Sequence, residues 1–203
     1  MNKYQNKYRI PSARLQHWNY GWNAAYFVTI CTHNRQNFFG KIAFGKMVLS
    51  EIGEITRQEW LKTFEMRPDM NLTMGEFVVM PNHFHAIIII GENEYNTQRI
   101  DDRDGNRYRD RYRRDAMHCV STYINNDINT TQNKFGPQSK NLASIVRGFK
   151  SAVTKRARSI NPMFAWQRNY YEHIIRDDES YIKISKYIKN NPQNWNKDDH
   201  YDN

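Results

Sequence analysis

Apolar residues recur along the chain with two different spacings, and these spacings predict seven elements. Runs of β-branched and aromatic residues indicate strands, whereas apolar residues three or four positions apart indicate amphipathic helices. The predicted order is strand, helix, strand, strand, helix, strand, helix. The expected ranges are 25–32, 47–64, 72–80, 84–90, 141–158, 166–175 and 177–190. The first six elements match a split β-α-β unit, so the predicted fold class is α+β: a ferredoxin-like sandwich with an antiparallel sheet and a further C-terminal helix.

The helix predicted over 141–158 has the clearest amphipathic pattern. Its apolar face is formed by Leu142, Ile145, Val146, Phe149, Ala152 and Val153. Its polar face carries the cations Arg147, Lys150, Lys155 and Arg156. These four cations are candidates for contacts with nucleic-acid phosphates, and a simply solvated helix face is the alternative.

The polar segments predict how the chain is organised. Residues 1–24 form a basic arm with four cations, no acidic residue and several aromatic rings, and residues 25–192 form a single domain. Within that domain, residues 92–140 lack apolar periodicity and are predicted to be an insertion loop. Such a loop is either a solvated linker or a contact for nucleic acid. Residues 193–203 form a polar tail.

Composition adds a positive charge and an abundance of aromatic rings. The 203 residues include 30 lysines and arginines against 21 acidic residues, a formal charge of +9, with 13 tyrosines, 10 phenylalanines and 5 tryptophans. Because cations neutralise phosphates and rings stack on unpaired bases, nucleic acid is a candidate partner; a basic protein without such a partner is the alternative. In the arm, the candidate contacts are the cations Arg9 and Arg14 and the rings of Trp18, Tyr20 and Trp22.

Neither a membrane nor a disulfide framework is indicated by the sequence. No apolar run approaches the ~20 residues that span a bilayer, and the N-terminal residues lack the apolar core of a signal peptide. Cys31 and Cys119 are too few for a cysteine framework, which fits a reducing compartment. The expected location is therefore the cytoplasm.

Two histidines separated by one residue lie in a predicted strand. Because side chains alternate along a strand, His83 and His85 are expected on one face, with Phe84 and Ala86 on the other. Two adjacent imidazoles supply half of a metal site, and two histidines merely hydrogen-bonded in a sheet are the alternative.

The last predicted helix places two polar side chains together. Tyr181, Ile184 and Ile188 define its buried face, and Tyr187 and Asn191 lie one turn apart at the edge of that face. The Asn191 carbonyl oxygen is a possible metal ligand, and the Tyr187 hydroxyl can reach a phosphate. A tyrosine at the edge of the core with its hydroxyl in water is the alternative.

Four blocks of this sequence resemble one family of enzymes. The segment Val79-Met-Pro-Asn-His-Phe-His-Ala-Ile-Ile resembles the HUH motif of the single-tyrosine transposases of bacterial insertion sequences, and Tyr26-Phe-Val-Thr-Ile-Cys-Thr-His-Asn-Arg resembles their first strand. Trp166-Gln-Arg-Asn-Tyr-Tyr-Glu-His-Ile-Ile-Arg and Tyr187-Ile-Lys-Asn-Asn-Pro192 resemble the last strand and the catalytic helix of the REP-associated tyrosine transposases. The blocks follow the family's order and cover residues 25–91 and 141–192.

This resemblance implies an HUH endonuclease domain that nicks single-stranded DNA beside a REP-like hairpin and transfers the strand through a 5′-phosphotyrosine. It implies that Tyr187 is the nucleophile and that His83, His85 and Asn191 hold a divalent metal, Mg²⁺ or Mn²⁺. Other candidate nucleophiles are Tyr170, Tyr171 and Tyr181, but only Tyr187 has Asn191 one turn after it.

The resemblance also implies partners and a location. The expected partner is single-stranded or hairpin DNA rather than a membrane, in a bacterial cytoplasm and associated with the nucleoid. Family members act as monomers or as homodimers. Because a fold does not fix a function, a catalytically silent protein that binds hairpin DNA or RNA on the same scaffold is the alternative.

Overall fold

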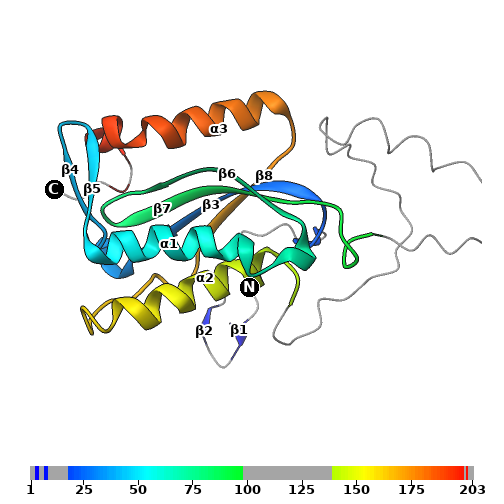
Figure 1. Ribbon diagram of the computed structural model, residues 1–203, viewed down its shortest axis with the longest axis horizontal. Coiled ribbons are helices and arrows are strands. Elements are labelled where there is room, and N and C mark those ends of the chain that lie inside the picture. Colours follow the sequence, from blue (N-terminus) through cyan, green and yellow to red (C-terminus); the bar gives the residue numbers. More distant parts are fainter. Residues whose placement is uncertain (1–2, 5–6, 9–17, 98–138, 199, 201–203) are drawn as a thin grey trace, which may run out of the picture.

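Four strands form an antiparallel sheet at the centre of the computed structural model (Figure 1). The structure describes residues 3–4, 7–8, 18–97, 139–198 and 200. The strands are β3 (Ala24–Cys31), β6 (Leu72–Val79), β7 (His83–Ile90) and β8 (Tyr171–Ile175). They lie in the order β6-β7-β3-β8, with every neighbouring pair antiparallel. This order is that of a split β-α-β unit, so the predicted α+β ferredoxin-like class is confirmed.

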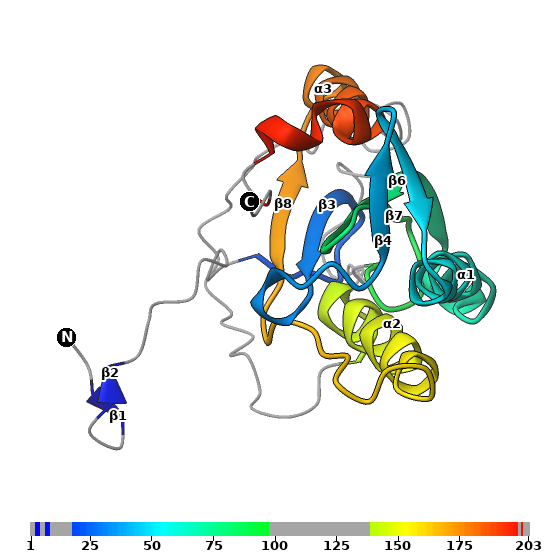
Figure 2. The same ribbon diagram turned by 90° about the vertical axis from the view of Figure 1, so that its left-hand side faces the viewer.

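Helices cover both faces of this sheet (Figure 2). The helices α1 (Glu51–Glu65) and α2 (Leu142–Ala157) pack on one face, where the larger hydrophobic cluster lies. The opposite face carries α3 (Asp178–Asn190), which buries Ile188 against a smaller cluster containing Phe27 and Ile87. Alternation along each strand therefore sends successive side chains into two separate cores.

Polar side chains fix where the helices begin. Ser50 caps α1 by accepting a hydrogen bond from the backbone N–H of Gly53 at 3.1 Å, and Asn141 opens α2 with a reciprocal capping box. The carboxylate of Asp177 accepts from the N–H of Ser180 at 2.7 Å, as expected for the start of α3. That helix ends two residues before Pro192 and continues as the 3₁₀ helix η3 (Asn191–Lys197).

A β-hairpin stands where the sequence pattern predicted the beginning of a helix. The strands β4 (Gly40–Ala43) and β5 (Lys46–Leu49) pair with each other, and α1 begins only at Glu51. The helix predicted from Met47 is therefore wrong over its first turn. Val48, which fitted the helical spacing, is exposed on the hairpin. Gly45 in the turn, with a positive φ of 70°, favours a hairpin, and the Ser50 cap sets the later start of the helix.

The last strand is also shorter than predicted. It begins at Tyr171 rather than Trp166, and Trp166 makes only an isolated bridge to Thr32. The Trp166 indole N–H donates to the carbonyl of Lys150 at 3.2 Å, and the ring packs against Phe164. Those side-chain contacts hold this segment against α2 and away from the continuous ladder with β3.

Close packing of α3 depends on a bulge in β6. The β6–β7 register shifts between Met74 and Phe77, and Gly75 lies in the bulge. A Cβ atom on Gly75 would lie 2.8 Å from Ile87 and 3.1 Å from the hydroxyl of Tyr181. A larger residue there would push α3 from the sheet, so Gly75 permits the approach that positions the end of this helix.

The predicted arm and insertion loop are described only in part. Two-residue strands, β1 (Lys3–Tyr4) and β2 (Lys7–Tyr8), pair antiparallel within the predicted basic arm, for which no strand was expected. Most of the predicted insertion at 92–140 lies outside the described residues, so the domain boundaries stay predictions. Two further 3₁₀ turns are η1 (His33–Arg35) and η2 (Pro68–Met70). No described helix combines the length and the apolar character that crossing a bilayer requires.

Candidate functional site

The two histidines of β7 lie side by side beneath α3. Their ring centroids are 4.4 Å apart, and both side chains are buried, His83 at 0% and His85 at 1% exposure. Phe84 points the other way, into the core against Trp60 and Phe149. The period-two spacing of the sequence therefore gives the orientation found in the structure.

Each imidazole is held through its Nδ1 atom. Asn82 Oδ1 lies 2.9 Å from Nδ1 of His83, and Thr29 Oγ1 lies 2.8 Å from Nδ1 of His85. Thr29 faces His85 directly across the β3–β7 ladder. Anchoring Nδ1 leaves Nε2 of both rings to point into the space below α3, which is the arrangement typical of histidines that bind metals.

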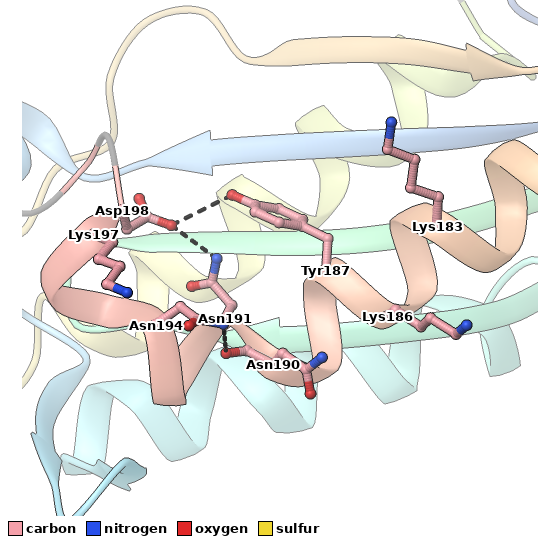
Figure 3. Close-up of a pocket in the computed structure, with 8 residues that line it drawn as sticks. All are labelled: Lys183, Lys186, Tyr187, Asn190, Asn191, Asn194, Lys197 and Asp198. Atoms are coloured by element: carbon pink, nitrogen blue, oxygen red, sulfur yellow. Dashed lines mark hydrogen bonds between the residues drawn. The ribbon is translucent and has the colours of Figure 1, made fainter.

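The end of α3 brings a tyrosine and an asparagine to these rings. The hydroxyl of Tyr187 lies 3.2 Å from Nε2 of His85, while 44% of this tyrosine remains exposed. Asn191 is buried at 2% exposure and donates from Nδ2 to Asp198 Oδ2 at 2.8 Å (Figure 3). The predicted pairing of Tyr187 and Asn191 at one spot is thus present, and it faces the two histidines.

The segment after η3 contributes two residues that no sequence pattern indicates. Asp198 Oδ2 lies 3.4 Å from the Tyr187 hydroxyl, and Asp198 Oδ1 pairs with Nδ1 of His200 at 2.9 Å. The His200 ring lies 4.5 Å from that of His83, and its backbone carbonyl accepts from Asn82 Nδ2 at 2.8 Å. Part of the predicted polar tail therefore lies in the site.

The charges of the site follow from burial and from one ion pair. Burial lowers the pKa of His85 to about 3 and holds that of His83 well below its usual range, with the neighbouring histidines adding to the effect on His83. The hydrogen bond that His200 donates to Asp198 raises the pKa of His200 to about 9. Although burial opposes ionisation of Asp198, hydrogen bonds from His200 and Asn191 lower its pKa. At neutral pH, His83 and His85 are therefore neutral imidazoles beside an ionised carboxylate.

These shifts predict that the metal-free protein loses stability in mild acid. Between pH 6.5 and about 3, unfolded His85 binds a proton that folded His85 does not, so the free energy of unfolding falls as pH falls. The slope from this group is at most about 1.4 kcal/mol per pH unit. The contribution of His200 is constant below pH 6.5 because its folded pKa is raised. Urea unfolding between about pH 7 and about pH 5 measures this slope, and His85→Gln should reduce it to the part that His83 contributes.

The donor atoms of the site fit a divalent metal. Among the described residues, Nε2 of His83 and Oδ1 of Asn191 are buried without a hydrogen-bond partner. Two such lone pairs, with Nε2 of His85 nearby, form a mixed nitrogen and oxygen set compatible with Mn²⁺ or Mg²⁺. Ligand atoms of His83, Asp198 and His200 also lie within 4.8 Å of one another, so the carboxylate is a further possible ligand.

Asn82 should control the metal without binding it. The side-chain amide of Asn82 is hydrogen-bonded to Nδ1 of His83 and to the His200 carbonyl. Because such bonds orient a metal-binding imidazole, Asn82→Ala is expected to reduce metal affinity by roughly 10- to 100-fold. Titration calorimetry with Mn²⁺ measures the loss. Asn194→Ala is the matched control, because Asn194 is exposed and its side chain donates to the carbonyl of Asn190 rather than to the site. Equal affinities in Asn82→Ala and wild-type protein would rule out this positioning role.

A basic hollow of about 260 Å³ opens beside Tyr187. The residues that line it are Lys183, Lys186, Tyr187, Asn190, Asn191, Asn194, Lys197 and Asp198 (Figure 3). Three lysines against one carboxylate give this hollow a positive balance. A phosphate group is the kind of ligand that such a balance attracts.

The cations predicted to bind DNA through α2 lie elsewhere. That helix packs on the face of the sheet opposite to α3, so Arg147, Lys150, Lys155 and Arg156 are not brought to Tyr187 (Figure 2). Lys150 donates to the carbonyl of Gln167 at 2.7 Å, and Arg156 pairs with Glu59 at 2.7 Å. Their DNA contacts stay predictions, and these two already have partners within the protein.

The aromatic residues of the arm pack on the start of β3. The Trp18 indole donates to the Tyr26 hydroxyl at 3.2 Å, its ring lies edge-on to Trp22, and Tyr20 lies beside Tyr26. These rings are therefore engaged with the core of the domain. The other two candidates of the arm, Arg9 and Arg14, lie outside the described residues.

The alternative tyrosines make other contacts. The hydroxyl of Tyr181 approaches Gly75 in β6, and Tyr171 packs edge-on against Phe27. Tyr170 packs against the core shared with α1 and α2. Of the four candidate tyrosines, Tyr187 is the one whose hydroxyl contacts an imidazole of the His83–His85 pair.

Comparison with known proteins places the chain in a family. No established family profile matches it. An uncharacterized protein of Haemophilus influenzae is 37% identical over 191 residues, which cover 94% of this chain and 92% of that protein. The two proteins belong to one family. Their shared length includes the residues from the central sheet to the end of α3.

A solved structure shares the fold of this family member. It is the structure of a REP-associated tyrosine transposase bound to a REP hairpin, and its TM-score with this chain is 0.51 at 16% sequence identity. The match covers 90% of this chain and 73% of that one. The protein therefore has a transposase-like fold, in agreement with the predicted class.

Proposed function

We propose that this protein is a metal-dependent tyrosine transposase of the HUH type, which nicks single-stranded DNA and transfers the cut strand. The observation that carries the proposal is the Tyr187 hydroxyl, half-exposed to solvent and 3.2 Å from Nε2 of a buried histidine. The unpartnered Nε2 of His83 and Oδ1 of Asn191 support a metal beside it. The likeness in fold to a tyrosine transposase agrees with this chemistry.

The proposed reaction exchanges one phosphate ester for another. The Tyr187 oxygen attacks the phosphorus of a DNA phosphodiester, a bond forms between them, and the bond to the 3′ oxygen breaks. The products are a 5′-phosphotyrosine and a free 3′-hydroxyl, so the proton lost by the phenol is balanced by the one gained by the leaving oxygen. Because the new ester keeps the energy of the old one, a 3′-hydroxyl can reverse the step and join strands.

The phenol proton needs an acceptor because tyrosine is mostly protonated at neutral pH, with a pKa of about 10. His85 Nε2 at 3.2 Å and Asp198 Oδ2 at 3.4 Å are both within reach of the hydroxyl. The same lone pair of His85 cannot accept the proton and bind a metal at once. We therefore assign the acceptor role to Asp198, whose carboxylate is ionised.

A divalent metal held by His83, His85 and Asn191 would polarise the scissile phosphate and offset its developing charge. Lys183, Lys186 and Lys197 would hold the flanking phosphates in the hollow beside Tyr187. The proposed substrate is DNA beside a hairpin, because the transposase with this fold was solved bound to a REP hairpin.

A covalent-adduct assay tests the proposal. The protein is incubated with Mn²⁺ and a 3′-end-labelled single-stranded oligonucleotide containing a hairpin, because the fragment on the 3′ side of the nick is the one that stays on Tyr187, and the products are separated on a denaturing gel. The proposal predicts a labelled band at the mass of protein plus DNA, which disappears with EDTA. Tight binding without an adduct across many hairpins would favour a catalytically silent binding protein instead.

A further inference from the structure

The hairpin formed by β4 and β5 ends beside the candidate site. It rises from the start of α1 to the C-terminal end of α3 (Figures 1 and 2). At its tip, Gly45 lies against η3, where a Cβ atom would come within 3.7 Å of the Gln193 side chain. The next residue of η3, Asn194, lines the hollow beside Tyr187. The tip is therefore one residue away from the wall of that hollow.

The tip itself carries an aromatic ring in an unusual backbone conformation. Phe44 and Gly45 have φ angles of +51° and +70°, so both central residues of this two-residue turn are in the left-handed region. Such turns favour Asn-Gly, and a bulky residue at the first position is strained. Phe44 is also fully exposed, at 103%. Strain at an exposed residue that packs on nothing in the described part of the chain indicates a role in binding.

The surroundings of the ring are basic. Lys41 and Lys46 are exposed on the hairpin, and no acidic residue occurs between positions 36 and 49. Beyond η3, the hollow adds Lys183, Lys186 and Lys197. A ring set among cations matches an unpaired nucleic-acid strand, in which phosphates pair with lysines and bases stack on rings. A second copy of this chain fits less well, because a two-fold contact through the tip would bring like charges together.

We propose that Phe44 is a stacking platform for an unpaired base of the DNA strand that enters the hollow beside Tyr187. The inference rests on the proposed function for the identity of the strand. It assigns to the β4–β5 hairpin the positioning of that strand, with the rigid contact between Gly45 and η3 fixing the ring relative to the nucleophile.

The hairpin turn offers a variant that removes the ring without weakening the fold. Asn-Gly is the preferred pair for this turn, so Phe44→Asn should hold the hairpin at least as well as the natural pair. Phe44→Trp keeps a stacking surface, and Phe44→Leu keeps an apolar side chain without a ring. All three are made in a Tyr187→Phe background, which prevents turnover during a binding measurement.

The binding experiment uses single-stranded oligonucleotides with 2-aminopurine placed at successive positions beside a hairpin. We expect Phe44→Asn and Phe44→Leu to weaken single-strand binding about tenfold, the order expected for one stacked base, and Phe44→Trp to retain it. The quenching of one 2-aminopurine should be lost with the ring. The salt dependence of affinity should not change, because no charge has been removed.

Several outcomes would overturn the inference: equal single-strand affinity in Phe44→Asn and its parent, an equal loss on fully paired DNA, or a change in oligomeric state by light scattering. Adduct formation by the protein with Tyr187 intact is measured separately. If adducts form while Phe44→Asn binds normally, the stacking role fails and the nicking proposal stands. If no adduct forms while the loss and the quenching change persist, nicking fails and the stacking role stands.

Discussion

Tyr187→Phe is expected to abolish covalent attachment to DNA, by at least about a thousandfold, since removal of a nucleophile leaves no atom to form the ester. The substitution removes one hydroxyl and keeps the ring, which lies edge-on to Phe27 at 6.2 Å. The fold and the binding of DNA should therefore survive. Denaturing gels measure the adduct, and fluorescence anisotropy measures the binding in the same preparation.

Tyr181→Phe is the matched control for that prediction. Tyr181 lies on the same helix, but its hydroxyl approaches Gly75 rather than the histidines, so its loss should leave adduct formation unchanged. An adduct that survives Tyr187→Phe and disappears with Tyr181→Phe would reassign the nucleophile. Loss of the adduct in both variants would indicate that the substitutions disturb the structure of α3, and it would not identify one hydroxyl as the nucleophile.

His83→Ala is expected to remove both metal binding and nicking. The buried Nε2 of His83 has no hydrogen-bond partner among the described residues, so it is the donor most clearly available to a metal. Mn²⁺ at a hundred times its dissociation constant should stabilise the wild-type protein by about 2.7 kcal/mol and the variant not at all. Thermal unfolding with and without Mn²⁺ measures the difference.

His33→Ala serves as the control, because His33 is an exposed histidine on η1 that belongs to neither candidate ligand set. Its stabilisation by Mn²⁺ should equal that of the wild-type protein. His200→Ala then separates the two possible ligand sets. Full metal binding in this variant would favour His83, His85 and Asn191, whereas its loss would favour the set that includes Asp198 and His200.

The parts of the site that could be predicted are those governed by local periodicity. Alternation along a strand is enough to place His83 and His85 on one face, and one helical turn is enough to align Tyr187 with Asn191. Thr29 could not be predicted in the same way. It reaches His85 through the register between β3 and β7, which depends on which residues of two distant segments pair.

The positions of Asp198 and His200 in the site could not be predicted from the sequence for a related reason. Nothing in a polar stretch shows where it will lie, and here the direction of the chain after α3 is set by η3. Asn82 gave a weak signal, because it adjoins the histidine pair. The hydrogen bond from the Asn82 amide to the His200 carbonyl joins segments that are far apart in the sequence, so local spacing could not predict it.

The cations of α2 show the opposite case, because a local pattern predicts the amphipathic helix but not its position in the fold. The amphipathic face is real, and Ile145 and Phe149 are buried as the spacing predicts. The pattern cannot tell which face of a sheet the helix will cover. Once α2 packs opposite to α3, Arg156 finds Glu59 within the protein rather than a phosphate at Tyr187.

Peptide mapping of the trapped complex tests the central claim most directly. The protein is reacted with a hairpin oligonucleotide and Mn²⁺, digested with nuclease and protease, and analysed by tandem mass spectrometry. We expect a residual 5′-nucleotide on Tyr187 and a free 3′-hydroxyl on the released DNA. A nucleotide carried by Tyr170, Tyr171 or Tyr181, or a nick with no nucleotide on any tyrosine, would contradict the account.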